Sequence, residues 1–175
     1  MEALDVIRKR RSIRRYKSEQ VNKEDIVKIL EAGMYAPSAM GTQSPYFVVV
    51  QDKEDRDTVA RLNAQVWGRE NFDPYYGAPT IILVFATNKA MSDFTKVIDA
   101  SAATTNMLNA AYSLGLGSCW IHRTKEVFEL EEGKELLRKW GIEEDLEGVA
   151  SIALGYPDMD LPEAKPRKED YYKII

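Results

Sequence analysis

The sequence contains almost none of the residues that build metal sites and disulfides. Among its 175 residues there is one cysteine, Cys119, and one histidine, His122. A single cysteine excludes an intrachain disulfide framework and is typical of a reducing compartment, so we expect a cytoplasmic protein. One histidine and one cysteine are too few for a His/Cys zinc site, and we expect no bound metal.

Motifs for acid–base and nucleophilic catalysis are equally scarce. With one histidine, no Ser-His-Asp arrangement is attractive, and the nucleophile-elbow pattern does not occur. Carboxylate pairs such as Glu131 and Glu132 fall in segments with a helical pattern, where solvated surface is the better interpretation. If the protein is an enzyme, a bound cofactor is therefore expected to supply the chemistry, with no catalytic side chain.

Targeting signals, repeats and low-complexity tracts are also missing. No apolar segment of the kind found in secretory signals follows the basic N-terminal region. Residues 100–121 have no charge and are long enough to span a bilayer, but Ser, Thr, Asn and Gly crowd them, which favours a buried helix over a membrane span. The length and a 45% hydrophobic content predict one domain over residues 1–175.

The periodicity of apolar residues predicts helices interleaved with strands. Strands are expected at residues 46–51, 80–87, 117–121 and 149–156. Helices are expected at residues 2–11, from an N-cap at Asn22 to Ala36, at 54–66, within the uncharged segment 100–121, and at 125–140 with a break near Gly133. This order predicts an α/β or α+β class with helices over a small sheet.

Two segments lie outside these elements. A turn is expected from Ser12 to Ser18. Residues 157–175 are rich in proline and charge and are predicted to form an extended C-terminal arm. Because the arm ends in the apolar sequence DYYKII, it is expected to dock on its own sheet or on another chain.

Positive charge is concentrated at the N-terminus in the sequence KRRSIRRYK, residues 9–17. Residues 1–17 hold seven basic residues against two acidic ones, a net +5 in a chain whose total is -4. Several guanidinium groups and a hydroxyl at a turn can bind phosphate, because arginine donates two hydrogen bonds to phosphate oxygens. Spacing alone slightly favours a solvated charged face over this clamp. Nucleic-acid binding ranks third, since the pI is near 5.2.

Three further stretches stand out, although each is weak alone. The loop APSAMGTQSP has small side chains that let backbone amides approach a flat ligand. The sequence GLGSCWI follows a helix and precedes a strand, the reverse of a Rossmann fingerprint, so that assignment fails. The sequence KPRK, residues 165–168, is a second basic group.

In this order and near this spacing, the four stretches resemble the nitroreductase family of FMN-dependent oxidoreductases. The resemblance rests on RRSIRRY, APSAMGTQSPYFVVV, AATTNMLNAAYSLGLGSCWI and LGYP followed by KPRK, and it covers most of the chain. It implies an α+β fold with a small, mostly antiparallel sheet covered by helices, in an intertwined homodimer. It also implies two FMN sites at the dimer interface, each built from both chains.

The resemblance implies a role for each matched residue. The FMN phosphate and ribityl chain would contact Arg10, Arg11, Ser12 and Arg14. The loop beside the flavin ring, from the other subunit, would supply Pro37, Ser38, Ala39, Gly41 and Gln43. The strand along the ring, with an amide facing N5, would supply Trp120, Ile121 and His122. Lys165 and Arg167 would complete the phosphate grip.

The implied activity is hydride transfer from NADH or NADPH through flavin N5 to nitroaromatic, quinone or related acceptors by a ping-pong mechanism. Gly41 stands where the family often has Asn, and His122-Arg123 where many members have Glu-Gly, which puts the acceptor range in question. A same-fold flavoenzyme with a dedicated reaction, such as reductive dehalogenation or substrate dehydrogenation, is the alternative. A non-catalytic anion or nucleic-acid binder is more remote.

Overall fold

The architecture is a four-stranded sheet between two layers of helices. The computed structural model describes residues 2–175, and Met1 of the predicted domain lies outside them. The sheet order is β1-β2-β4-β3, and every neighbouring pair is antiparallel. The strands are β1 (Pro45–Val50), β2 (Thr80–Thr87), β3 (Gly117–Ile121) and β4 (Leu146–Gly155). The predicted α+β class is confirmed.

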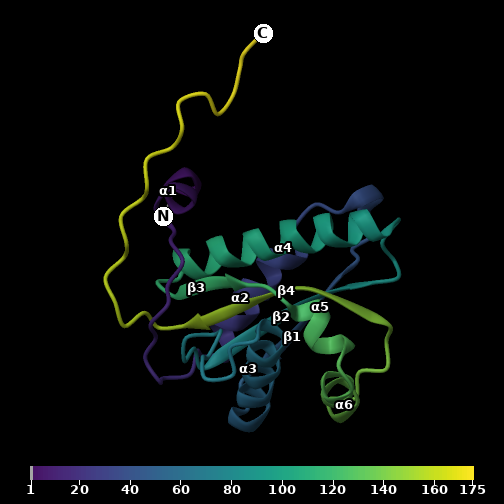
Figure 1. The fold of residues 1–175 in the computed structure, drawn as a ribbon. Coiled ribbons are helices and arrows are strands. Elements are labelled where there is room, and N and C mark those ends of the chain that lie inside the picture. The colour runs from purple at the N-terminus through teal and green to yellow at the C-terminus, as the bar shows by residue number, and fades with distance from the viewer. Residues whose placement is uncertain (1) are drawn as a thin grey trace.

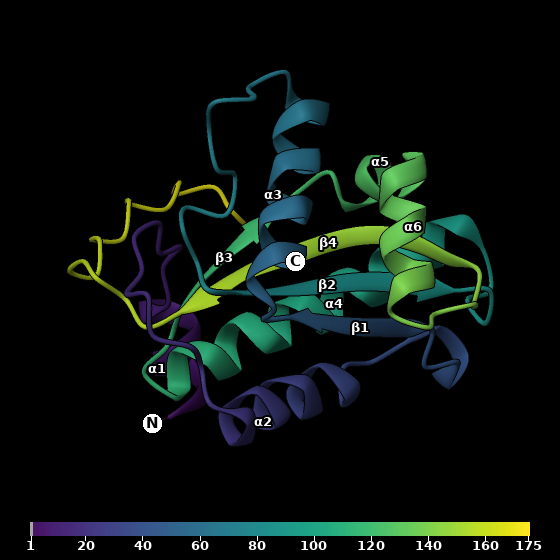
Figure 2. The ribbon, with the colours of Figure 1, turned by 90° about the horizontal axis from the view of Figure 1, so that it is seen from below.

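Helices cover both faces of this sheet (Figure 1). The helices are α1 (Ala3–Lys9), α2 (Lys23–Met34), α3 (Lys53–Trp67), α4 (Asp93–Ser113), α5 (Thr124–Glu129) and α6 (Glu131–Lys139), with a 3-10 turn, η1, at Ala39–Gly41. One core cluster joins α2 and α4 to the sheet, and the other joins α3, α5 and α6 to its opposite face. Figure 2 shows α3, α5 and α6 on the side nearer the viewer.

Strand β2 has the bounds that its apolar run predicts. It lies between β1 and β4, and its residues Ile81 to Ala86 are all buried. A strand covered on both faces needs no polar alternation, which explains the continuous sequence IILVFA.

Helix α4 differs from the prediction at its start and in its burial. It begins at Asp93, ahead of the uncharged segment, with a capping box in which Ser92 and Thr95 bond each other's backbone amides. Only one face is buried, including Ala100, Met107 and Ala111. The opposite face is half-buried or exposed in this chain, so the predicted burial of the helix is confirmed only for the face toward the sheet.

One local prediction is wrong, and a second is shifted by three residues. Residues 12–18 are not a turn but an extended segment, because Ser12 bridges Ser118 and Tyr16 bridges Pro157. The break in residues 125–140 falls at Leu130, which has extended backbone angles, and Gly133 lies inside α6. A side chain at Gly133 would clash, since an added Cβ would lie 2.1 Å from the Val127 carbonyl oxygen.

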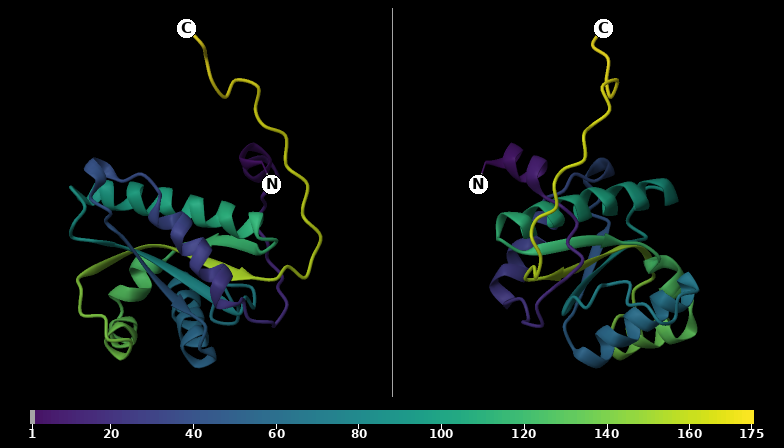
Figure 3. Two further views of the ribbon diagram at one scale, coloured as in Figure 1. Left: turned by 180° about the vertical axis from the view of Figure 1, so that it is seen from behind. Right: turned by 60° about the vertical axis from the view of Figure 1, so that its left-hand side comes forward.

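After β4 the chain is extended and leaves the body of the protein (Figure 3). All residues from 160 to 175 are exposed, including four large apolar side chains near the end: Tyr171, Tyr172, Ile174 and Ile175. Within residues 2–175, no helix is both long enough and apolar enough to cross a membrane.

Candidate cofactor site

The N-terminal basic stretch is fixed to the outer edge of β3. The amide of Ile13 donates to the carbonyl oxygen of Ser118 at 3.0 Å, and Ser12 forms a parallel bridge with Ser118. The Ile13 side chain is buried in the core. The approach is close because Gly117 has no side chain: an added Cβ would lie 2.9 Å from Ile13 Cγ2. Buried Ile13 therefore anchors the charged residues on either side of it.

The arginines differ in whether they have acidic partners. Lys9 pairs with Asp5 at 3.6 Å, and Arg15 pairs with Asp158 at 3.5 Å. Among residues 2–175, no acidic side chain forms an ion pair with any of the three arginines assigned to the cofactor, which are Arg10, Arg11 and Arg14. The exposed Arg8 and Lys17 also form none.

This arrangement leaves positive charge uncompensated in a half-buried place. Burial, and next the neighbouring Arg11, lower the pKa of Arg10. Arg11 Nη1 donates to the Arg8 carbonyl at 2.8 Å, while its buried Nε and the buried Ser118 hydroxyl have no hydrogen-bond partner among residues 2–175. Crowded guanidinium groups and free donors fit a phosphate, which would supply both the missing charge and the missing acceptors.

Burial raises the pKa of Cys119, which lies beside this cluster. A thiol with a raised pKa is a poor nucleophile at neutral pH. Its side chain belongs to the core cluster that also contains Ile13 and Tyr16. Cys119 is therefore a packing residue.

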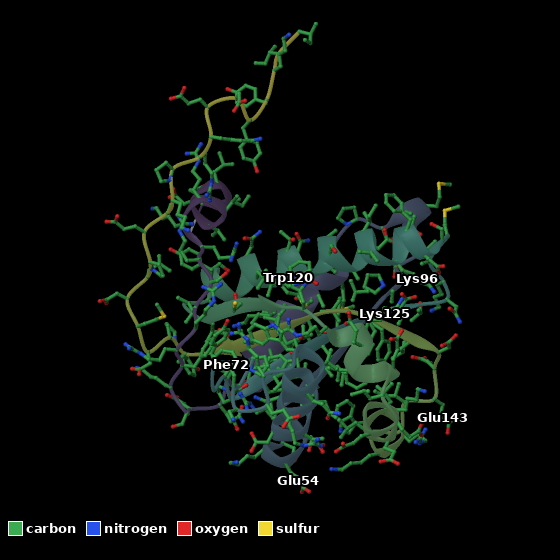
Figure 4. All side chains as sticks on the ribbon, in the orientation of Figure 1. Glu54, Phe72, Lys96, Trp120, Lys125 and Glu143 are labelled. Atoms are coloured by element: carbon green, nitrogen blue, oxygen red, sulfur yellow. The ribbon has the colours of Figure 1, made fainter. Side chains whose placement is uncertain are left out.

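Strand β3 continues past the anchored stretch with its outer edge open. Backbone groups alternate along a strand, so the Trp120 amide points to the same edge as the Ser118 carbonyl. The Trp120 ring packs against the α4 side of the core, and its buried Nε1 has no partner in the described chain (Figure 4). The exposed His122 ring lies 6.0 Å from the Trp120 ring, centroid to centroid. Ile121 points to the opposite core.

The corner after β3 is held by Asn63, a residue that the motifs did not indicate. Asn63 is fully buried on α3; its Nδ2 donates to the His122 carbonyl at 2.8 Å, and its Oδ1 accepts from Arg123 Nε at 2.9 Å. Arg123 has a left-handed φ of 77°. Tyr75 supports the corner, because its hydroxyl lies 3.4 Å from Asn63 Nδ2 and 3.0 Å from Ser151 Oγ. Burial raises the pKa of Tyr75 to about 12.

The Pro-Ser loop is a strained segment fastened to α4. The residues Met40, Gly41 and Gln43 have positive φ angles of 52°, 67° and 50°. Ser38 Oγ accepts from the Gln43 amide at 2.9 Å. The buried carboxylate of Asp99, which sequence reasoning also missed, accepts from the Ala39 amide and from Ser44 Oγ, each at 3.0 Å.

The loop borders a hollow of about 460 Å³ between the end of α2 and the start of β1. Ser38 and Gln43 line it, together with Gly33 and Phe47. Pro37 and Gly41 are exposed, and Ala39 is half-buried. The hollow is thus an open, partly polar surface next to two of the predicted flavin contacts.

One chain does not bring the two groups of predicted residues together. The loop is tied to Asp99 near the start of α4, whereas β3 begins at Gly117, just after the end of α4, and runs beneath the C-terminal half of that helix (Figure 1). At 1.5 Å per residue, the part of α4 from Asp99 to Ser113 separates the loop from the start of β3, where Ser12 and Ile13 are anchored, by about 20 Å. Lys165 and Arg167 lie on the extended arm, where Arg167 Nη1 donates to the Lys165 carbonyl, and neither forms a hydrogen bond to the N-terminal arginines.

Comparisons with known proteins show which chains this one is similar to. The profile of the nitroreductase family matches residues 7–156. A protein of Archaeoglobus fulgidus, described provisionally as an NADH dehydrogenase/NAD(P)H nitroreductase, is 36% identical over 95% of this chain and 92% of its own. Two crystal structures of nitroreductases with bound FMN are also similar. The one from Bacteroides fragilis has a TM-score of 0.89 and 29% identity, covering 100% of this chain and 99% of that one. The one from Desulfitobacterium hafniense has a TM-score of 0.85 and 25% identity, covering 100% of both. The chain therefore belongs to the nitroreductase family.

Proposed function

We propose that this FMN-dependent oxidoreductase accepts electrons from NADH or NADPH and reduces nitroaromatic, quinone or related acceptors in a ping-pong cycle. When bound, FMN supplies the hydride chemistry at N5. The protein's task is then to bind and orient, and no side chain at the site takes an acid–base role in the proposed cycle.

The observation that carries the proposal is the set of arginines without acidic partners at the β3 edge. The phosphate would be held by Arg10, Arg11, Arg14 and the Ser12 hydroxyl. Its two negative charges would neutralise part of the positive charge of these arginines. The backbone from Trp120 to His122 would border the flavin ring, where the open edge of β3 offers an amide. Asn63 would position this border by fixing the corner after it.

We further propose a homodimer in which each site takes residues from both chains. The open face of α4 exposes Phe94, Val97 and Ile98, with exposed fractions of 75%, 50% and 48%. Apolar surface of this extent on one helix face favours a protein partner. A second copy would also place its Pro-Ser loop, Pro37–Gln43, beside the first copy's arginines.

The C-terminal arm suits the same partner. Strand β1 is an edge strand, and a cleft of about 480 Å³ along it is lined by residues 46–52 with Trp140 and Ile142. The apolar end of the arm, residues 170–175, matches such an edge, because an added strand satisfies the free backbone groups. Lys165 and Arg167 would reach the partner's phosphate site from this arm. The buried, free Cys119 supports a cytoplasmic location.

The absorbance spectrum of the purified protein tests the proposed cofactor and donor. We expect a yellow protein whose flavin bands bleach on anaerobic addition of NADH or NADPH and return on addition of a quinone. A colourless protein that takes up no FMN on titration would refute the proposal. A flavoprotein that bleaches but is slow with both quinones and nitroaromatics would indicate a dedicated reaction instead.

Subunit complementation tests the shared site. One variant, Arg10→Gln/Arg14→Gln, loses the arginine half; the other, Gly41→Val, strains the loop half, because valine disfavours the positive φ at that position. When the two variants are mixed in equal amounts and their subunits exchange at random, about half of the dimers are heterodimers. Each heterodimer has one intact site out of two, so about a quarter of all sites should bind FMN again. Recovery of no sites after verified exchange would place both halves of the site in one chain.

A further inference from the structure

A second group of arginines comes from two segments: Arg69 follows the end of α3, and Arg123 follows β3 just after His122. The group consists of the guanidinium groups of Arg69 and Arg123 and the Trp67 ring on which both lie. The guanidinium carbon of Arg69 and that of Arg123 each lie 4.5 Å from the centroid of the Trp67 ring. Trp67 is 37% exposed, so these charges stand at the surface and not in the core.

An arc of aromatic rings connects this group to the phosphate-binding arginines. Trp67 meets Phe72 at 5.5 Å and Phe72 meets Tyr76 at 5.6 Å, both edge to face, and Arg14 lies 5.8 Å from the Tyr76 ring. Phe72, labelled in Figure 4, is the middle ring of the arc. The arc thus begins at a proposed phosphate ligand and ends at Arg123, the residue after His122. It follows the border of the proposed flavin site.

The arginines of the arc retain free hydrogen-bond donors. Within residues 2–175, the Arg69 side chain forms no hydrogen bond or ion pair, and Arg123 uses only Nε, toward Asn63. The nearby carboxylate of Asp73 is already engaged by Arg56 Nη2 and by the backbone amides of Tyr75 and Gly77. Exposed Glu70 likewise forms no ion pair.

Stacking gives these free donors a direction. A guanidinium group that lies on a ring uses its face and leaves its N–H edge open, and that edge matches the two oxygens of a carboxylate or phosphate. If Arg69 and Arg123 served only to stiffen the loop by packing on Trp67, the loop would not need their positive charge. In a chain with a net charge of -4, exposed Arg69 and half-buried Arg123 lie on one ring and have no acidic partner among residues 2–175, which indicates an anionic ligand.

We propose that Trp67, Arg69 and Arg123 form an anion-recognition rim that selects substrates bearing an oxyanion at the mouth of the flavin site. The inference rests on the proposed function and adds the class of substrate. Two sources share this chemistry: the extra phosphate of NADPH on the donor side, and a carboxylate on a flat aromatic acceptor. The rim binds and orients the substrate, and it takes no part in hydride transfer.

Matched substrate pairs test the rim in the holoenzyme. The donor pair is NADPH and NADH with a neutral quinone; the acceptor pair is 4-nitrobenzoate and 4-nitrobenzyl alcohol. For Arg69→Gln we expect KM of the anionic member of one pair to rise about three- to fivefold, because an exposed ion pair contributes a free energy of that size to binding. The kcat values and the KM of the neutral member should stay within about twofold of the wild type. Arg69→Lys should restore part of the affinity, and about 0.5 M salt should remove most of the difference.

Arg138→Gln is the control, because Arg138 is an exposed arginine on α6 paired with Glu131 at 2.7 Å, and it should change neither pair. The substrate pair whose anionic member shows the raised KM identifies the anion as the extra phosphate of NADPH or as an acceptor carboxylate. If Arg69→Gln and Arg69→Gln/Arg123→Gln both leave the anionic-to-neutral KM ratios of both pairs at the wild-type values, the rim is refuted.

Failure of the proposed function would look different. In that case the wild-type protein would lack flavin or turnover with every pair. The rim would then be tested by titrating tryptophan fluorescence with NADP⁺ against NAD⁺ and with 4-nitrobenzoate against 4-nitrobenzyl alcohol, and equal affinities of the wild type and Arg69→Gln for both anions would overturn it.

Discussion

Replacing Arg10 by Gln should change stability in opposite directions with and without FMN. Arg10 is half-buried, its pKa is lowered by burial and then by Arg11, and it forms no ion pair with the described residues. Without FMN, its charge is therefore a cost to folding. With FMN, the same charge would bind the phosphate. The substitution keeps most of the side-chain volume and removes only the charge.

The two effects have calculable sizes. Removing a crowded, half-exposed charge should raise the free energy of unfolding of the FMN-free protein by about 0.5–1 kcal/mol. Losing a charge-assisted hydrogen bond to phosphate costs about 1.5–3 kcal/mol of binding free energy, so Kd should rise about 10- to 100-fold. At a FMN concentration of 100 Kd the wild type gains about 2.7 kcal/mol from binding, and a variant with a 30-fold higher Kd gains about 0.9 kcal/mol. The variant should then be about 1 kcal/mol less stable than the wild type.

Urea unfolding at one protein concentration, with and without FMN, measures the reversal, and flavin fluorescence quenching measures Kd. Arg15→Gln is the matched control: Arg15 is paired with Asp158, so its FMN affinity should stay within about twofold of the wild type. The reasoning is refuted if FMN-free Arg10→Gln is less stable than the wild type while its Kd for FMN is unchanged.

Two further substitutions test the supports of the site, and a third tests the ion pair of Asp55 on α3 with Lys139 on α6. Gly117→Val should overpack against Ile13, lower the free energy of unfolding by about 1–3 kcal/mol in urea titrations and weaken FMN binding; unaltered values would show that the strand edge adapts. Asp99→Ala removes the acceptor of the half-buried Ala39 amide in the Pro-Ser loop and of the buried Ser44 hydroxyl just after it, so we expect a similar loss together with faster proteolysis within the loop, and intact loop protection would contradict it. Although burial opposes it, the hydrogen bond from Lys139 helps to lower the pKa of Asp55, so wild-type stability should be complete above about pH 4 and fall as the pH drops through the lowered pKa; Asp55→Asn should lack this part of the acid dependence, and parallel pH profiles would exclude the mechanism.

Local signals in the sequence predicted much of the fold. Asn22 is the N-cap of α2, as its position before two acidic residues indicates, and its Oδ1 accepts from the Asp25 amide at 2.8 Å. The start of α4 was missed because its first turn is charged and polar, unlike the uncharged segment that drew attention. The extended segment after Ser12 was missed because its hydrogen-bond partner, Ser118, lies far along the chain.

The same difference between local signals and contacts with distant residues applies to the site. Motifs indicated which arginines and which loop to consider, and the ion pairs of Lys9 and Arg15 now separate these surface charges from Arg10 and Arg14. Sequence patterns did not indicate Asn63 and Asp99, because each contacts residues 55 to 60 positions away. An isolated Asn or Asp in a helical segment has no local feature that indicates such a contact.

The length of α4 also restricts how two copies can combine. The arginines lie near its C-terminal end and the Pro-Ser loop near its N-terminal end, with an exposed apolar face beginning at Phe94. If two copies packed these helices parallel, like ends would meet and both sites would stay divided. If a two-fold axis crosses the helices near their middles, they run antiparallel, and each C-terminal end meets the partner's N-terminal end. We therefore expect the antiparallel arrangement, because it alone completes two sites at once.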